Sequence, residues 1–273
     1  FGVIWVGAAQ VGTLLLVLCV MAPLYLWRGG LPIGTLRFDW ALARSMLKES
    51  WQIFAGALLA VIYLKIDMVM LRWMSGPGEV GIYSVAARIS EVPYILAGTL
   101  VTTIFPRLIE LHKSGSPVYA ARLQTVFQVM AALALPVVAG VALLGPPVIG
   151  LAFGPEFAAA GPMLIIHMLA MPFIYMRYVF SRWMIMERFT VFSIYSHGAG
   201  AVANIALNLL LIPAMGGIGA AIATVVSYAC ASYLALLLHG RTRPVFWMMS
   251  RALFMPWKGL TALHRIRKNA ANN

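Results

Sequence analysis

Long apolar stretches alternate with short polar segments along most of this chain. Each stretch has about the 20 residues that an α-helix needs to cross roughly 30 Å of hydrocarbon, and none shows the short alternating pattern of a strand. The predicted crossings are residues 3–27, 50–73, 81–105, 122–144, 160–180, 190–212 and 217–238. The pattern therefore predicts an all-α integral membrane protein, a polytopic helical bundle of about seven transmembrane helices.

The composition agrees with this prediction. Hydrophobic residues make up 62% of the chain, the mean hydropathy is +0.89, and only 10% of the residues are charged. Ordinary soluble domains carry roughly 25% charged residues. The two cysteines, Cys19 and Cys230, lie far apart in apolar stretches, with the spacing of neither a metal site nor a disulfide framework. We expect no metal and no cofactor.

The chain has a net charge of +12, and its basic residues are distributed unevenly between the two sides of the predicted topology. If the crossings alternate in direction, Arg72 falls on one side of the membrane, while Lys65 and Arg88 lie inside crossings. The other lysines and arginines, Arg177 among them, all fall on the opposite side. Because Lys and Arg concentrate on the cytoplasmic side of membrane proteins, we expect a cytoplasmic C-terminus, a visible N-terminus outside, and no nucleic-acid partner.

Two segments are predicted to lie on the membrane surface. Residues 35–50 place basic side chains on one helical face and apolar side chains on another, which is typical of an interfacial helix. Residues 244–260 are apolar but short, and Arg251 and Pro256 interrupt them. We expect this second segment to be interfacial as well.

Four ionisable residues share a level well inside two successive crossings, where a charge at the helix centre costs at least about 2.5–3.5 kcal/mol. Lys65 and Asp67 lie on one crossing, and Arg88 and Glu91 lie at a similar depth on the next. Arg88 and Glu91 share a helix face, whereas Lys65 and Asp67 are roughly 200° apart around theirs. We therefore expect Asp67 to pair with Arg88, which leaves Lys65 free.

These charges allow two interpretations. They form a buried structural ion pair that holds two helices together, or they line a hydrated lumen and bind a substrate or a coupling ion. Both interpretations can hold at once.

Three other polar residues are weaker candidates. Asn204 and Asn208 are four residues apart and so stack on one helix face, where hydrogen bonds between helices are expected. His167 stands alone in an apolar stretch, either as a titrating group or as a packing residue. The sequence contains no catalytic motif of the HExxH, GxSxG or phosphate-loop type, so we expect no catalytic residues and no enzyme.

Three segments carry a family resemblance. They are IDMVMLRWMSGPGEVGIYSVAARISEVPY (66–94), PVVAGVALLGPPVIGLAFGPEFAAAGPML (136–164) and NLLLIPAMGGIGAAIATVVSY (208–228). In this order they resemble the bacterial polysaccharide-biosynthesis flippases, the lipid-linked oligosaccharide (O-antigen-type) translocases of the multidrug/oligosaccharidyl-lipid/polysaccharide exporter superfamily. The resemblance implies two six-helix lobes that face each other across a central cavity, with both termini cytoplasmic.

The resemblance also implies a division of the chain. Residues 1–27 correspond to the last helix of the first lobe, 28–49 to a cytoplasmic amphipathic connector, and 50–238 to the second six-helix lobe. Residues 239–273 would form a cytoplasmic basic tail with an interfacial helix. We expect the chain to be the C-terminal half of a longer transporter, the product of a broken gene, or a protein completed by another chain.

The implied function is transport of an undecaprenyl-pyrophosphate-linked oligosaccharide across the bacterial inner membrane. Arg88 and Lys65 would meet the pyrophosphate, and Asp67 and Glu91 would be counter-charges or proton carriers. The implied partners are the lipid-linked glycan, membrane lipids, and a missing first lobe or other polysaccharide-assembly proteins. The alternatives are a drug/cation antiporter or a peptidoglycan-precursor flippase of the same superfamily, a membrane glycan polymerase or ligase, and a non-functional fragment.

Overall fold

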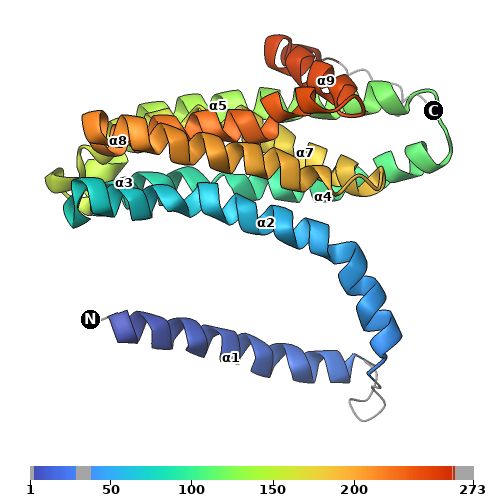
Figure 1. The fold of residues 1–273 in the computed structure, drawn as a ribbon, viewed down its shortest axis with the longest axis horizontal. Coiled ribbons are helices and arrows are strands. Elements are labelled where there is room, and N and C mark those ends of the chain that lie inside the picture. The colour runs from blue at the N-terminus through green and yellow to red at the C-terminus, as the bar shows by residue number, and fades with distance from the viewer. Residues whose placement is uncertain (1–2, 29–37, 260, 262–273) are drawn as a thin grey trace. The chain divides into compact units, whose positions relative to one another are not determined.

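The computed structural model describes residues 3–28, 38–259 and 261, and these are helical with no strand among them (Figure 1). The predicted all-α fold is confirmed. The chain divides into two compact units, Phe1–Glu49 and Ser50–Asn273.

The first unit contains α1 (Val3–Trp27) and the start of α2 (Trp40–Ser75). Asp39 caps α2, because its Oδ1 accepts a hydrogen bond of 3.1 Å from the backbone N–H of Leu42. The predicted connector lies partly outside the described residues, which omit 29–37. The described part of the connector, from Trp40, belongs to α2. The expected interfacial helix is therefore assigned to the same helix of 36 residues as the next crossing.

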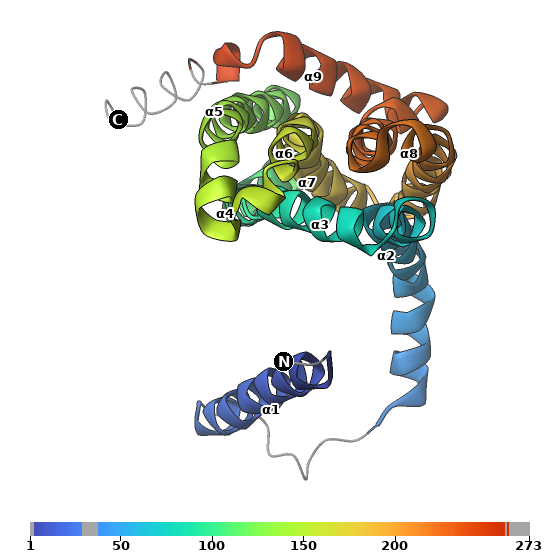
Figure 2. The same ribbon diagram turned by 90° about the vertical axis from the view of Figure 1, so that its left-hand side faces the viewer.

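The second unit contains the rest of α2 and all later helices. These are α3 (Pro77–Glu91), α4 (Tyr94–Lys113), α5 (Tyr119–Phe153), α6 (Ala160–Met168), α7 (Met171–Met186), α8 (Phe192–Ser232) and α9 (Arg243–Phe254), with short 3-10 turns η2 at Pro155–Phe157 and η3 at Leu234–Leu238. Viewed end-on, α6 and α7 lie in the middle of this unit (Figure 2). There α6 packs against α3, α5 and α8, and α7 packs against α4, α5 and α8.

Within the described residues, four helical stretches are long and apolar enough to cross a membrane. They are Ser50–Ser75, Pro77–Lys113, Tyr119–Phe153 and Phe192–Leu238. The pair α6 and α7, bent by 43°, adds a fifth if it counts as one span. This is a multi-pass membrane protein. The stretch Phe192–Leu238 doubles back on itself, so it holds both of the crossings predicted at 190–212 and 217–238.

The reversal of α8 occurs at Gly216, whose φ of 55° and ψ of −133° are not helical. The Glu79 carboxylate accepts a hydrogen bond of 2.8 Å from the backbone N–H of Gly217, and so stabilises the start of the second half of α8. The two halves then approach closely, because a Cβ on Gly200 would lie 2.7 Å from the Cβ of Ala231. They run side by side as an antiparallel pair (Figure 1).

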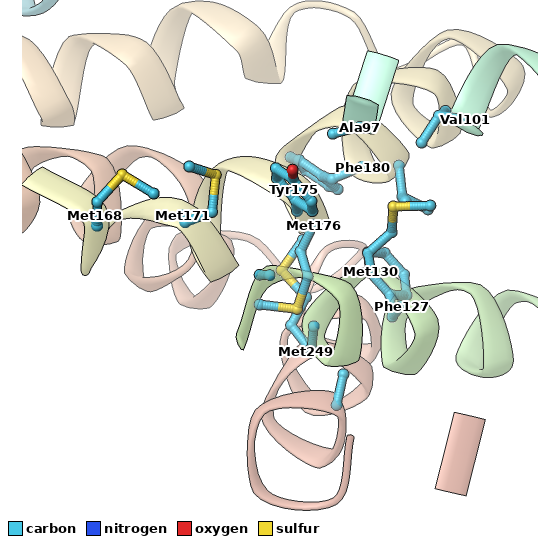
Figure 3. Close-up of a cluster of buried hydrophobic side chains, with 14 of the residues drawn as sticks. Ala97, Val101, Phe127, Met130, Met168, Met171, Tyr175, Met176, Phe180 and Met249 are labelled. Atoms are coloured by element: carbon cyan, nitrogen blue, oxygen red, sulfur yellow. The ribbon is translucent and has the colours of Figure 1, made fainter. Parts of the chain in front are cut away.

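The core of the second unit is rich in methionine. Figure 3 shows side chains of α4, α5, α7 and α9 meeting there, with Met130, Met176 and Met249 near Phe127 and Phe180, while Met168 and Met171 lie further along the same core. Unbranched thioether side chains fill irregular gaps between such aromatic rings. A second, smaller cluster includes Tyr63, Ile174 and Tyr228, which line the cleft described below.

Helix α9 covers most of the segment at 244–260, and its position on the membrane surface stays a prediction. It packs against α5 and η3, burying Val245, Phe246 and Met249. Trp247 and Phe254 remain exposed on its other side. Residues 260 and 262–273 of the predicted tail lie outside the described residues, so the membrane side of the tail stays a prediction.

Candidate functional site

Lys65 and Glu91 form an ion pair between α2 and α3. Lys65 Nζ lies 3.1 Å from Glu91 Oε1, and 52% and 40% of the two side chains are exposed. The predicted pair of Asp67 with Arg88 is wrong, because Asp67 is buried and Arg88 is exposed. Tyr83 and Ala87 occupy the buried face of α3, and Arg88, the next residue, turns outward and is exposed.

Asp67 points into the bundle and is only 2% exposed. Its Oδ2 accepts a hydrogen bond from the Tyr83 hydroxyl and lies 3.1 Å from the Thr224 hydroxyl, while Oδ1 accepts one of 2.8 Å from the backbone N–H of Met68. Asp67 thus joins α2 to α3 and to the second half of α8. The partners of the Asp67 carboxyl group are thus neutral hydroxyl and backbone groups, and not the guanidinium of Arg88 that we expected.

A cleft of about 480 Å³ opens among α2, α3, α4, α7 and α8, and the ion pair of Lys65 and Glu91 lies on its wall. The same wall carries Arg177 and His197. The ring side chains that line it are Tyr63, Tyr94, Tyr178 and Tyr228. Such a size lies within the roughly 300–1,000 Å³ of small-molecule sites.

Arg177 is a functional candidate that sequence reasoning missed. We expected it in a cytoplasmic loop, but it lies inside α7 and is only 8% exposed. Its Nη1 donates hydrogen bonds of 3.0 Å to the Ser196 hydroxyl and 2.9 Å to the Ala231 carbonyl. Its Nη2 lies 2.7 Å from His197 Nε2. The only sequence signal for this position was an arginine within the predicted crossing 160–180.

The contacts of His197 determine its tautomer. A guanidinium has no acceptor, so His197 Nε2 must accept from Arg177, and Nδ1 must carry the hydrogen. His197 Nδ1 then donates to the Tyr63 hydroxyl, 3.1 Å away. The Tyr63 and His197 rings also stack, with centroids 5.7 Å apart. Arg177, His197 and Tyr63 therefore form a continuous hydrogen-bonded chain along the cleft wall, which we call the Arg177 chain.

The weaker candidates lie away from this cleft. Asn208 Nδ2 donates a hydrogen bond of 2.9 Å to Asn204 Oδ1, and both side chains are buried in α8. The expected bond between helices is thus a bond within one helix, because the i,i+4 spacing brings the two amides together. His167 is buried, with its ring 5.2 Å from that of Tyr83.

A larger cleft of about 660 Å³ lies between the C-terminal parts of α4 and α7. It contains Lys113 and Arg182 but none of the predicted site residues, and both of these cations are exposed. The described residues include no group of three His, Cys, Asp or Glu side chains that could hold a metal ion. The smaller cleft, with its buried cation and its ion pair, is the better candidate site.

Residues 2–112 match the family described as polysaccharide biosynthesis protein. The predicted resemblance to the polysaccharide-biosynthesis flippases is confirmed. Two curated proteins from Haloferax volcanii are similar to this chain. The probable low-salt glycan biosynthesis flippase Agl15 is 24% identical over 68% of this chain and 40% of its own length. The probable flippase AglR is 28% identical over 64% of this chain and 37% of its own length.

The fold also resembles that of a solved flippase. The structure of the lipid II flippase MurJ in an inward closed conformation matches 82% of this chain with a TM-score of 0.62 and 20% identity. The match covers 49% of the MurJ chain. The present chain thus spans about 40% of the length of the curated relatives it matches, and about half of MurJ.

Proposed function

We propose that this chain is the C-terminal half of a flippase that moves a lipid-linked glycan across the bacterial inner membrane. The family match, the relatives and the flippase-like fold support this proposal. In this proposal residues 50–238 act with a first lobe, and α1 is the last helix of that lobe. The one-sided distribution of Lys and Arg supports a cytoplasmic C-terminus.

The observation that carries the proposal is the ion pair of Lys65 and Glu91 on the cleft wall. Charges at membrane depth are kept where they face water, a partner or a substrate. Both side chains are partly exposed to the cleft, so an incoming anion can replace Glu91 as the partner of Lys65. This exchange suits the pyrophosphate of an undecaprenyl-linked oligosaccharide. In the same proposal Arg88 is a further cation of the lumen, and Asp67 and Glu91 are counter-charges or proton carriers.

The charge of the cleft favours a glycan flippase over a drug/cation antiporter. Its wall carries Lys65 and Arg177 but, within the described part of the chain, a single carboxylate, that of Glu91. An excess of positive charge attracts anions and repels cations. We therefore propose a transporter of anionic lipid-linked glycans, rather than a cation antiporter or a glycan-polymerising enzyme.

The proposal is tested by replacing Lys65→Gln or Arg88→Ala at the chromosomal gene and measuring surface polysaccharide and the amount of protein in the membrane. We expect loss of surface polysaccharide with a near-normal amount of protein. The control is Arg72→Gln, at the exposed end of α2, which should export normally. Normal export in both test variants overturns the proposal. Loss of the protein itself assigns these side chains a structural role instead.

A further inference from the structure

Arg177 is a buried cation with no carboxylate beside it among the described side chains. Its hydrogen-bond partners, the Ser196 hydroxyl, the Ala231 carbonyl and the His197 ring, are all neutral. Its Nε is buried and has no partner among the described residues. Arg177 also takes part in none of the salt bridges that these residues form. Burial of a charge without a counter-charge is costly, and a bound anion would offset that cost.

Arg177 lies on the wall of the cleft, where an anion that enters the cleft can reach it. Arg177 on α7 and Lys65 on α2 line the same cleft of about 480 Å³. Glu91 already lies beside Lys65, 3.1 Å away, so it does not neutralise Arg177 as well. The cleft therefore has one positive charge that no described residue balances.

The Arg177 chain extends this charge to a second donor. His197 accepts from Arg177 and donates to the Tyr63 hydroxyl, which leaves the hydroxyl hydrogen of Tyr63 available. Hydrogen bonds in such chains polarise one another, and more strongly in a medium of low dielectric constant. Tyr63 thus becomes a better donor to an anion at the cleft wall.

The rest of the lining indicates what else the ligand carries. The rings of Tyr94, Tyr178 and Tyr228 combine an apolar face with a hydroxyl, and such faces suit the C–H side of a sugar ring. The combination of a cation, a polarised hydroxyl and aromatic faces matches a sugar that bears a phosphoryl group.

We propose that Arg177, with His197 and Tyr63, forms an anion subsite that holds the phosphoryl group of the lipid-linked sugar. This inference rests on the proposed function and names the part of its substrate that this cleft binds. The anion binds between the Arg177 chain and Lys65, and it displaces Glu91 from Lys65.

The test uses the full-length gene product purified from its host in lipid nanodiscs. The probes are undecaprenyl pyrophosphate, free inorganic pyrophosphate, and undecaprenol as the uncharged lipid. We expect the charged lipid to bind with an affinity that falls as salt rises, and Arg177→Gln to weaken this binding about tenfold to hundredfold, the usual effect of losing a charged hydrogen bond. Arg182→Gln, an exposed arginine on the same helix, is the matched control and should bind normally.

Tyr63→Phe keeps the test decisive if Arg177→Gln fails to fold. It removes one oxygen atom and keeps the ring, and we expect several-fold weaker binding of the charged lipid by a protein that still folds, with a melting temperature lowered by the loss of the acceptor of His197 Nδ1. Equal binding by wild type and Tyr63→Phe, or by wild type and a folded Arg177→Gln, overturns the subsite. Tighter binding of free pyrophosphate than of the charged lipid also overturns the assignment to a lipid-linked group.

Failure of this inference is distinguishable from failure of the proposed function. If export depends on Lys65 and Arg88 while binding ignores Arg177, the flippase stands and the subsite does not. If binding depends on Arg177 while export is normal in the Lys65 and Arg88 variants, the proposed function fails and an anion site remains.

Discussion

Lys65 Nζ lies 3.1 Å from Glu91 Oε1 on the wall of a cleft, while Asp67, two residues further along α2, is buried on the opposite side of the same helix. Successive residues turn by about 100° around a helix, so positions two apart meet different surroundings. One residue is exposed to a cavity that can admit a substrate, and the other is buried where α2 packs against α3 and α8. Their roles should therefore separate by mutation.

Reversing both charges of the ion pair tests whether export needs the pair or only one of its charges. We expect Lys65→Glu and Glu91→Lys each to abolish surface polysaccharide, because like charges then face each other. The double variant should recover it in part, since the pair is restored. The free energy of unfolding should change by less than about 1 kcal/mol in each variant, because both side chains are partly exposed. Full activity of either single variant contradicts the expectation.

The Asp67 cluster should contribute to stability. We expect Asp67→Ala to lower the free energy of unfolding by about 1–3 kcal/mol, because the buried Tyr83 hydroxyl loses its carboxylate acceptor, whereas Thr224 keeps the Ala220 carbonyl. Tyr83→Phe should also destabilise, and the double variant should lose less than the sum of the two changes. Unfolding in detergent measures all three. Ser84→Ala is the control, since that hydroxyl bonds only to the Gly81 carbonyl of its own helix.

The reversal of α8 should require glycine at position 216. Its φ of 55° disfavours other residues, and a Cβ there would lie 2.9 Å from Glu79 Oε1. We expect Gly216→Ala to destabilise the protein by about 1–3 kcal/mol. Gly81→Ala is the matched control, because a Cβ there meets nothing within 4 Å and alanine favours the helix by roughly 0.5–1 kcal/mol. A neutral Gly216→Ala would show that the loop relaxes without cost.

The close contact between the two halves of α8 should be sensitive to a single methyl group. A Cβ on Gly200 would lie 2.7 Å from the Ala231 Cβ and 3.2 Å from the Ser227 carbonyl oxygen, whereas one on Gly140 meets nothing within 4 Å. We expect Gly200→Ala to cost about 1–3 kcal/mol by overpacking, and Gly140→Ala to cost nothing. Because Ala231 also bonds Arg177, Gly200→Ala should weaken binding of the charged lipid as well. Melting temperatures with and without that lipid report both effects.

The pattern of the sequence predicted the helices well but misplaced Arg177. The predicted crossing 160–180 put this arginine near a helix end, where a charged side chain reaches water. The structure breaks the helix between Met168 and Met171 and continues it to Met186, so Arg177 lies in the middle of α7. A break of two residues leaves hydropathy almost unchanged, and hydropathy therefore did not reveal it.

The sequence by itself determined that the chain forms membrane-length helices and that α8 would divide near residues 213–216. These are local properties, set by the cost of placing backbone and side chains in hydrocarbon. Only the tertiary structure decided that Lys65 meets Glu91, that Asp67 meets Tyr83 and Thr224, and that Arg177 meets Ser196, His197 and Ala231. Those partners depend on how each helix is rotated about its own axis, which is set by close packing of small and large side chains between helices distant in the sequence.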